Sequence, residues 1–294
     1  MFRVGILGAE NSHAMAFTEI FNGLKPEYGD EFSDIRVVAV GGNYPEENRK
    51  VFERGGLELL AERPEELLGR VDAVMVTARD GRYHAPFVRP FLEAGIPAFV
   101  DKPFTSDPQE ALSLIRLAQD KKVPLVGGSS VKLCEGVQRL RAHVLEGADD
   151  VLGGDLTAPV SMQNDYGDFW FYSAHLVESC LRVFGYDPQW VWASRHPGGV
   201  TAVLHYDRYE VTNHFTDGAY FYSGTVNTRK GSFYEPLDIQ SIYALECRSF
   251  ARMLRTGEMD FPYEQLAKPV EVLAAIERSF QTGERQPLSD SFGR

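Results

Sequence analysis

The sequence predicts an α/β protein with a doubly wound parallel sheet in its N-terminal half and an α+β domain with an open, mostly antiparallel sheet in its C-terminal half. Two observations lead to this prediction. In residues 1–126, short apolar segments alternate with amphipathic helical segments, as in a parallel sheet covered on both faces. In residues 127–294, several segments alternate apolar with polar residues across short turns, as antiparallel strands do. We therefore place a domain boundary between residues 126 and 127.

The N-terminal half is predicted to contain five strands and five helices in alternation. The first strand ends at Gly8, and the helix that follows carries its apolar residues at helical spacing on one face. Pro45 lies in the first turn of the second helix, where a missing N–H is tolerated. The predicted strands are 3–7, 35–40, 72–77, 97–100 and 123–126, and the predicted helices are 12–23, 45–54, 64–68, 86–94 and 107–121.

The C-terminal half is predicted to be an antiparallel meander between helices. Short turns, such as Asp217-Gly218, join its strands. The predicted helices are 135–145, 173–184, 239–255 and 263–281, and the predicted strands are 190–194, 200–206, 209–215, 220–227 and 231–234.

Composition excludes several classes of protein. The 294-residue chain has 42 acidic and 30 basic side chains, so its net charge is −12, which argues against binding to nucleic acid or to an anionic membrane. Its three cysteines form no Cys-x-x-Cys pair, which argues against a disulfide framework or a structural zinc. His205 and His214 lie on adjacent predicted strands, but no carboxylate cluster joins them, so we predict no metal site. There is no apolar run long enough to span a membrane and no signal peptide, so we expect a cytoplasmic protein.

The segment from Gly8 to His13 has the order of a Rossmann first turn. A strand, a glycine and a helix N-terminus present bare backbone N–H groups to a pyrophosphate. Gly8 holds the first glycine position, but Glu10 and His13 replace the second and third glycines. Asn11 or Ser12 is expected to cap the helix. Ser12 is also a candidate phosphate ligand, and His13 is a candidate contact of the nicotinamide or the substrate.

Three motifs in the N-terminal half carry a family resemblance. Residues 77–80 (Thr-Ala-Arg-Asp) follow a buried strand and precede His84, residues 93–95 read Glu-Ala-Gly, and residues 101–103 read Asp-Lys-Pro. In this order and spacing they resemble the Gfo/Idh/MocA oxidoreductases, the group of glucose–fructose oxidoreductase and inositol 2-dehydrogenase. The resemblance implies a Rossmann domain that binds NAD or NADP. It also implies a second domain whose open sheet forms a homodimer or homotetramer.

The loops and the resemblance together give a set of cofactor-binding candidates. No acid follows the second strand, so Asn43 is the candidate for the ribose and the choice between NAD and NADP stays open. Arg49 and Lys50 either bind the 2′-phosphate of NADP or are merely solvent-exposed charges on the second predicted helix. The candidates are Gly8, Glu10, Asn11, Ser12, His13, Asn43, Thr77, Arg79, His84, Asp101 and Lys102.

The resemblance places the catalytic residues at Lys102 and His175. Lys102 is expected to contact the substrate hydroxyl and the nicotinamide, and a neutral His175 is a natural general base. His175 and Glu178 match the second half of the family pattern Asp-x-Gly-x-His-x-x-Asp, but Phe171 occupies the place of its first Asp. Tyr172 is our candidate to assist proton transfer in place of the missing Asp, and Asp168 and Tyr166 are alternatives. The competing interpretation is a solvated helix face with a Glu178–Arg182 pair.

These observations favour an NAD(P)-dependent oxidoreductase that acts on a hydroxyl of a sugar, cyclitol or related polyol. The small-molecule substrate is expected to bind between the two domains. One alternative is a ligand-binding or regulatory protein without redox turnover, since Glu10 and Phe171 depart from the family pattern. Another uses the cofactor transiently for an elimination or epimerisation.

Overall fold

The computed structural model describes residues 1–147 and 149–289, which form two compact units. Unit 1 contains residues 1–128 and 243–266, and unit 2 contains residues 129–242 together with the chain from 267 onward. The first division falls two residues after the boundary expected from the sequence. The return of residues 243–266 to unit 1 was not expected, because we had assigned every residue after 126 to the second domain.

Unit 1 is built on a six-stranded sheet with the order β3-β2-β1-β4-β5-β6, and all of its strand pairs are parallel. The chain runs outward from β1 to β3, then restarts at β4 and runs outward to β6. This confirms the doubly wound sheet and places its topological switch point between β1 and β4, where ligands bind in such folds. The strands are β1 (Phe2–Leu7), β2 (Ile35–Gly41), β3 (Leu59–Leu60), β4 (Ala73–Val76), β5 (Ala98–Asp101) and β6 (Leu125–Gly128).

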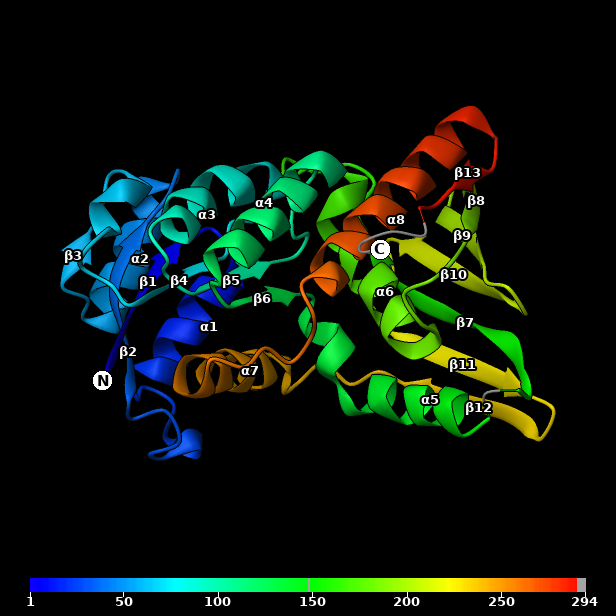
Figure 1. Cartoon of the computed structure of the whole chain (residues 1–294), viewed down its shortest axis with the longest axis horizontal. Helices are drawn as coiled ribbons and strands as arrows, with labels where there is room; N and C mark the ends of the chain where they lie inside the picture. The colour runs from blue at the N-terminus through cyan, green and yellow to red at the C-terminus, as the bar shows by residue number, and fades with distance from the viewer. Residues whose placement is uncertain (148, 290–294) are drawn as a thin grey trace. The chain divides into compact units, whose positions relative to one another are not determined.

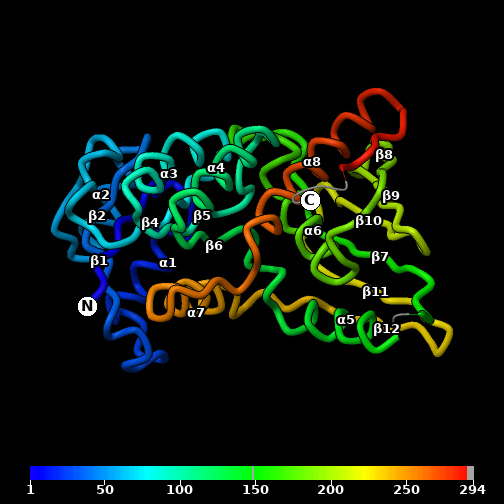
Figure 2. The backbone as a smooth tube through the Cα atoms, in the orientation of Figure 1, coloured from blue at the N-terminus to red at the C-terminus, as the bar shows by residue number. Residues whose placement is uncertain are grey.

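Helices cover both faces of this sheet. One face packs against α1 and α7, and the other packs against α3 and α4 (Figures 1 and 2). Asp107 caps α4 by accepting hydrogen bonds from the backbone of Gln109 and Glu110. The helical segments of unit 1 are α1 (Ser12–Phe21), η1 (Pro26–Tyr28), α2 (Pro45–Gly55), η2 (Pro64–Leu67), η3 (Gly81–Tyr83), α3 (His84–Glu93), α4 (Pro108–Lys121) and α7 (Ile242–Thr256).

Helix α7 belongs to unit 1 because its apolar face completes the core of that unit. Cys247, Phe250 and Met253 are buried in one cluster with α1 and the sheet, and Phe250 packs against Phe21 and Phe99. The sequence predicted this helix, but its periodicity shows only that one face is apolar and not which surface covers that face.

Unit 2 is built on a seven-stranded mixed sheet with the order β12-β11-β7-β10-β9-β8-β13. Helices α5 and α6 pack against strands of this sheet, and Ser279 of α8 accepts a hydrogen bond from the backbone of β8. The strands are β7 (Val151–Val160), β8 (Trp190–His196), β9 (Gly199–His205), β10 (Glu210–Asp217), β11 (Ser223–Thr228), β12 (Gly231–Pro236) and β13 (Gln286–Pro287). The helices are η4 (Ser130–Leu133), α5 (Glu135–Glu146), α6 (Phe169–Phe184) and α8 (Glu264–Thr282).

The prediction of a simple meander is wrong, because β7 separates β10 from β11. Strands β8 to β10 do form a meander, but β7 pairs in parallel with β10 and antiparallel with β11. The sequence of β7 suggests a turn, since it contains Gly153-Gly154 and Pro159. The glycines are needed for close approach: a Cβ on Gly154 would lie 2.1 Å from the carbonyl oxygen of Thr225.

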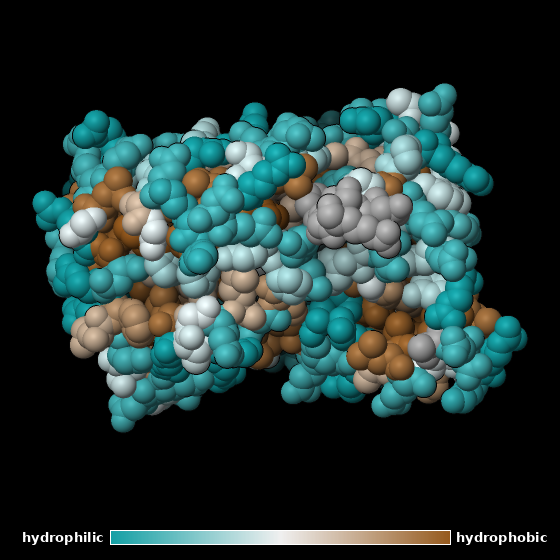
Figure 3. Space-filling model, in the orientation of Figure 1, coloured by the Kyte–Doolittle hydropathy of each residue, from teal (hydrophilic) through white to brown (hydrophobic). Residues whose placement is uncertain are grey.

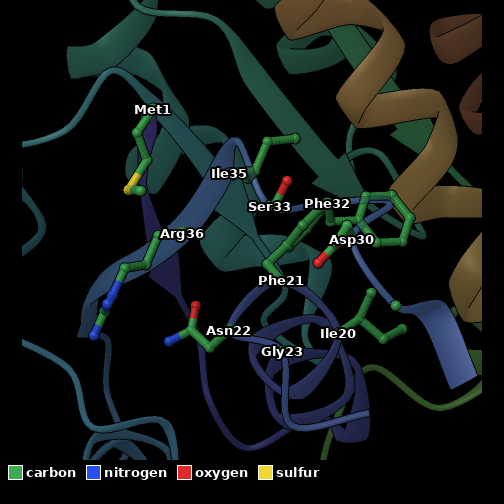
Figure 4. A pocket seen from close by; sticks show the side chains of 11 residues that line it. Met1, Ile20, Phe21, Asn22, Gly23, Asp30, Phe32, Ser33, Ile35 and Arg36 are labelled. Carbon is green, nitrogen blue, oxygen red and sulfur yellow. The ribbon is translucent and has the colours of Figure 1, made fainter. Parts of the chain in front are cut away.

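One cavity of unit 1 lies away from the carboxyl edge of the parallel sheet. Figure 3 shows a largely hydrophilic surface with separate apolar patches. Unit 1 contains a cavity of about 330 Å³. Met1, Ile35 and Phe32 are among the residues that line it (Figure 4). It lies at the amino ends of β1 and β2, the edge opposite to the one where such sheets bind ligands. Among the described residues, no helix is long and apolar enough to cross a membrane.

We expect Gly8→Ala to destabilise unit 1 by about 3 kcal/mol, because it adds both an unfavourable backbone conformation and a steric overlap. Gly8 has φ +93°, and a Cβ there would lie 2.4 Å from the backbone nitrogen of Ala78. Gly23→Ala is the matched control: Gly23 has φ +71° with nothing within 4 Å of its Cβ, so only about 1 kcal/mol should be lost. Urea unfolding measures both variants, and equal losses would contradict the close approach.

Candidate functional site

The carboxyl ends of β1 and β4 meet at Gly8 and Thr77. The Thr77 hydroxyl donates a 2.7 Å hydrogen bond to the carbonyl oxygen of Gly8, and Gly8 lies against Ala78. Gly42 follows β2 with φ +136°, and a Cβ there would lie 2.8 Å from the nitrogen of Gly8. These contacts bring three loops together at the switch point of the sheet. Gly8 and Thr77 are therefore placed at this edge, as expected.

The loop from β1 to α1 presents free backbone donors. Asn11 is the N-cap of α1, as predicted, and its side chain accepts a hydrogen bond from the nitrogen of His13. Within the described chain, the backbone N–H groups of residues 9–12 have no protein acceptor. Unpaired donors at a helix N-terminus fit an anionic group such as a pyrophosphate. The loop thus fits a dinucleotide despite the missing glycines.

Glu10, at the second glycine position, is anchored to the neighbouring loop. Its Oε1 accepts a 2.9 Å hydrogen bond from the backbone nitrogen of Arg79. This bond draws the carboxylate toward the loop after β4 and joins the two loops. Glu10 and Arg79 are therefore joined by a hydrogen bond. Direct contact of either residue with a cofactor stays a prediction.

Asp101 is the fully buried charge at the end of β5. Its Oδ1 accepts a 2.7 Å hydrogen bond from the backbone nitrogen of Lys102, and its Oδ2 accepts a 2.9 Å bond from Asn11. His13 Nδ1 lies 2.7 Å from the same Oδ2. Burial alone would raise the pKa of Asp101, but the positive charges of His13 and Lys102 outweigh it and lower the pKa to about 2. Asp101 therefore remains a carboxylate near neutral pH.

Lys102 follows Asp101 and is only 3% exposed. The peptide bond from Lys102 to Pro103 is cis. His84, which is completely buried, has Nδ1 2.7 Å from the carbonyl oxygen of Pro103 and Nε2 2.8 Å from that of Ala78. Both ring nitrogens of His84 are thus used by the protein, so His84 positions the loop that carries Lys102.

Helix α7 contributes two residues to this edge that the sequence analysis missed. The Tyr243 hydroxyl lies 3.0 Å from the hydroxyl of Ser12, and Glu246 Oε2 lies 3.9 Å from His13 Nδ1. Glu246 is 2% exposed, which is unusual for a carboxylate. A buried polar residue on the apolar face of a predicted helix was the signal available in the sequence.

The ribose candidates lie apart from this buried network. Asn43 is exposed after β2, and Arg49 is exposed on α2. Lys50 pairs with Glu47 at 2.6 Å, which agrees with the solvated-helix alternative for that lysine. His205 and His214 do not face each other, because His205 pairs with Glu210 and His214 pairs with Thr201 in the β9–β10 register.

Unit 2 contains a second buried polar cluster, around His175 on α6. His175 Nδ1 lies 2.7 Å from the hydroxyl oxygen of Ser129. Glu178 Oε2 accepts hydrogen bonds of 2.8 Å from the backbone nitrogen of Ser129 and of 2.8 Å from Lys132 Nζ. Because Glu178 is 3% exposed and pairs with Lys132, the interpretation of this face as a solvated one is wrong.

Ser129 was missed as the partner of His175. Among the residues considered for the place of the missing Asp, Tyr172 packs with its ring centroid 6.1 Å from that of His175. Asp168 instead accepts a hydrogen bond from the backbone of Asn164. Tyr166 packs against Phe171. Ser129 follows the last parallel strand directly, so a polar residue at a strand's carboxyl end was the available signal.

Comparison with known proteins agrees with the geometry at the carboxyl edge of unit 1. Residues 2–128 match the model of the Gfo/Idh/MocA family, described as an oxidoreductase family with an NAD-binding Rossmann fold. Residues 2–128 are therefore similar to the NAD-binding Rossmann domain of that family. The expected cofactor class, NAD or NADP, is thereby supported by both the family and the free donors of residues 9–12.

The Gfo/Idh/MocA relatives include inositol dehydrogenases. Inositol 2-dehydrogenase of Corynebacterium glutamicum is 41% identical over 54 residues, which is 18% of this chain and 16% of that protein. The scyllo-inositol dehydrogenase of Lactobacillus casei, solved with NAD(H) and scyllo-inositol, has a TM-score of 0.81 at 13% identity and covers 98% of this chain and 99% of its own. GenD2 of gentamicin A biosynthesis, solved with NAD, has a TM-score of 0.83 at 16% identity, with 98% and 96% covered. At these identities the two solved structures show that the fold is shared.

We expect Lys132→Met to destabilise unit 2 by about 3–5 kcal/mol, because it leaves the Glu178 carboxylate buried without its ammonium partner. The double variant Lys132→Met/Glu178→Gln should recover part of this loss, since no buried charge remains. Arg139→Met, which breaks the ion pairs of a half-exposed arginine with Glu135 and Glu235, is the control and should shift the urea midpoint little. A double variant as unstable as Lys132→Met would contradict the ion-pair explanation.

Proposed function

We propose that the protein is an NAD(P)-dependent oxidoreductase that acts on a hydroxyl group of a sugar, cyclitol or related polyol. The observation that carries the proposal is Lys102, an ammonium held almost without exposure at the carboxyl end of β5. It lies in the segment Asp101-Lys102-Pro103, which resembles the Glu-Lys-Pro motif of the family whose model matches residues 2–128. Free backbone donors at the N-terminus of α1 support the binding of a pyrophosphate in the same unit. Inositol dehydrogenases among the relatives support a polyol as the substrate class.

The chain's own residues have separate tasks in the proposed reaction. When bound, the nicotinamide supplies hydride acceptance or donation. Lys102 orients the hydroxyl and stabilises the negative charge that develops on its oxygen. His175 takes the hydroxyl proton, and Ser129 holds the orientation of its ring. Tyr172 contributes to the aromatic surroundings of His175.

The first test of the proposal is cofactor binding. When the full chain is titrated with NADH or NADPH, we expect saturable quenching of the protein fluorescence or saturable energy transfer from the protein to the bound dinucleotide. NADH should bind more tightly, because Lys50 is paired with Glu47 and no arginine directly follows β2 to bind a 2′-phosphate. If neither dinucleotide binds at millimolar concentration, the proposal is wrong. If one binds but no polyol in a broad panel is turned over, the ligand-binding alternative is supported instead.

The second test of the proposal concerns the catalytic role of Lys102. We expect Lys102→Met to lower kcat/KM by at least about 100-fold, as loss of a group that stabilises a developing oxyanion does. Lys121→Met, at the exposed end of α4, is the control and should keep the wild-type rate. Steady-state kinetics at the nicotinamide absorbance measure both variants. Turnover of Lys102→Met at the wild-type rate would remove this residue from the mechanism.

We also propose that the open face of the unit 2 sheet joins copies of the chain into a dimer or tetramer. Trp192, Val203 and Thr212 lie side by side across β8, β9 and β10, and Trp192 is 38% exposed. An exposed aromatic beside half-buried residues on a sheet face is typical of an interface.

We expect Val203→Glu to convert this assembly to monomers, because it places a charge at the centre of the proposed contact. Light scattering coupled to gel filtration measures the mass. Lys230→Glu, at the exposed turn between β11 and β12, is the charge-changing control and should leave the mass unchanged. A wild-type protein that is monomeric at all concentrations would contradict the interface.

A further inference from the structure

Aromatic side chains of unit 2 form a connected cluster on one side of His175. The centroid of the His175 ring lies 6.1 Å from that of Tyr172 and 6.1 Å from that of Tyr222. The ring of Tyr220 lies 6.3 Å from that of Tyr172 and 5.8 Å from that of Tyr222. Two intervening rings, each in contact with both, therefore link His175 to Tyr220.

This cluster runs from the interior of unit 2 to its surface. His175 is 6% exposed and Tyr222 is 8% exposed, whereas Tyr220 is 65% exposed and the adjacent Phe221 is 51% exposed. Single exposed apolar side chains are common on proteins, but neighbouring ones that continue a buried cluster are typical of a binding surface. The exposed pair thus extends the aromatic surroundings of His175 outward.

The segment that carries the exposed pair is held by the sheet and by its neighbours. It joins β10 to β11, and Gly218 turns the chain with φ +78°. Directly after the pair, the carbonyl oxygen of Tyr222 accepts a 2.9 Å hydrogen bond from the backbone nitrogen of Leu237. Tyr220 contacts Tyr172 and Tyr222 edge to face, with interplanar angles of 85° and 86°. A surface that is ordered in advance loses little entropy when it binds a ligand.

The chemistry of the pair suits a carbohydrate ring. Such a ring carries hydroxyls around its edge and C–H bonds on its faces, so a face can pack on an aromatic ring while the hydroxyls stay in water. Tyr220 offers an apolar ring together with a hydroxyl that both donates and accepts hydrogen bonds. Phe221 adds a second apolar ring beside it. Neither side chain is charged, which matches an uncharged sugar.

We propose that Tyr220 and Phe221 form an outer subsite that binds the second ring of a glycosidic substrate, while the hydroxyl to be oxidised lies at His175. Tyr172 and Tyr222 already flank His175, so the reacting ring lies beside these two. A single ring would leave the outer pair in water, whereas a second ring joined by a glycosidic bond covers it. The subsite rests on the proposed oxidoreductase function and specifies its substrate class as a glycoside with two rings.

The test compares glycosides that share one sugar and differ in the second group. Methyl and phenyl β-glycosides of glucose, galactose and mannose are assayed by steady-state kinetics at the nicotinamide absorbance. For the sugar that is oxidised, we expect kcat/KM to be about 5-fold higher for the phenyl glycoside than for the methyl glycoside. The gain should lie mainly in KM, because an outer subsite binds ground state and transition state alike.

Tyr220→Ala should abolish this preference for the phenyl glycoside, and Tyr220→Phe, which keeps the ring, should retain it. Tyr234→Ala is the matched control, because Tyr234 is also 65% exposed in unit 2 but lies on β12. It should keep the wild-type preference. Melting temperatures verify that every variant folds.

Calorimetric titration with the same glycosides repeats the comparison without turnover and separates this proposal from the proposed function. Tighter binding of a phenyl glycoside that Tyr220→Ala abolishes, without any oxidation, would support the subsite and contradict the oxidoreductase. Oxidation of free sugars or cyclitols without a preference between glycosides, or a preference that survives in Tyr220→Ala, would overturn the subsite and leave the oxidoreductase intact. A lower mass of Tyr220→Ala in light scattering, with an unchanged preference, would assign the pair to a contact between copies and overturn the subsite as well.

Discussion

The burial of Asp101 is the constraint on which the carboxyl edge of unit 1 depends. A carboxylate with no exposure must be compensated by donors or cations, and this one has several from distant parts of the chain. Asn11 brings the start of α1, Lys102 brings its own backbone, and His13 adds a ring that also touches α7 through Glu246. Lys102 therefore helps to compensate the buried carboxylate of Asp101, both through its backbone N–H and through its positive charge.

A second consequence concerns the departure from the glycine fingerprint. In the usual pattern the second glycine lets the backbone approach a pyrophosphate. Here Glu10 is drawn aside by the nitrogen of Arg79, while residues 9–12 keep their N–H groups without a protein acceptor in the described chain. In a chain of net charge −12, these local dipoles must supply the attraction for the phosphates. The carboxylate of Glu10 is thus tied to a neighbouring loop.

How far the sequence predicted the structure depended on the kind of information each element carries. The parallel sheet of unit 1 was predictable, because strands buried on both faces are continuous apolar runs. Strand β7 was not, because Gly153 and Gly154, which close backbone neighbours require, resemble a turn in the sequence, as does Pro159. Glu246 and Ser129 were missed for a different reason. Each acts on a residue far away in the chain, and periodicity carries no information on such partners.

The partner of His175 also changes the chemistry expected of it. The family pattern places an Asp where this chain has Phe171, and here the hydroxyl of Ser129 meets Nδ1 instead. Ser129 Oγ also accepts a hydrogen bond from the nitrogen of Val131 at 3.2 Å. A hydroxyl oxygen has two acceptor positions, so Ser129 can either donate its proton to Nδ1 or accept a proton from it. The contact therefore accommodates both neutral tautomers of the His175 ring. A hydroxyl stabilises an imidazolium by its dipole alone, and the carboxylate bound to the backbone of Ser129, that of Glu178, is paired with Lys132. In the reaction that we propose, proton transfer at His175 therefore relies on a rotatable hydroxyl rather than on a fixed charge.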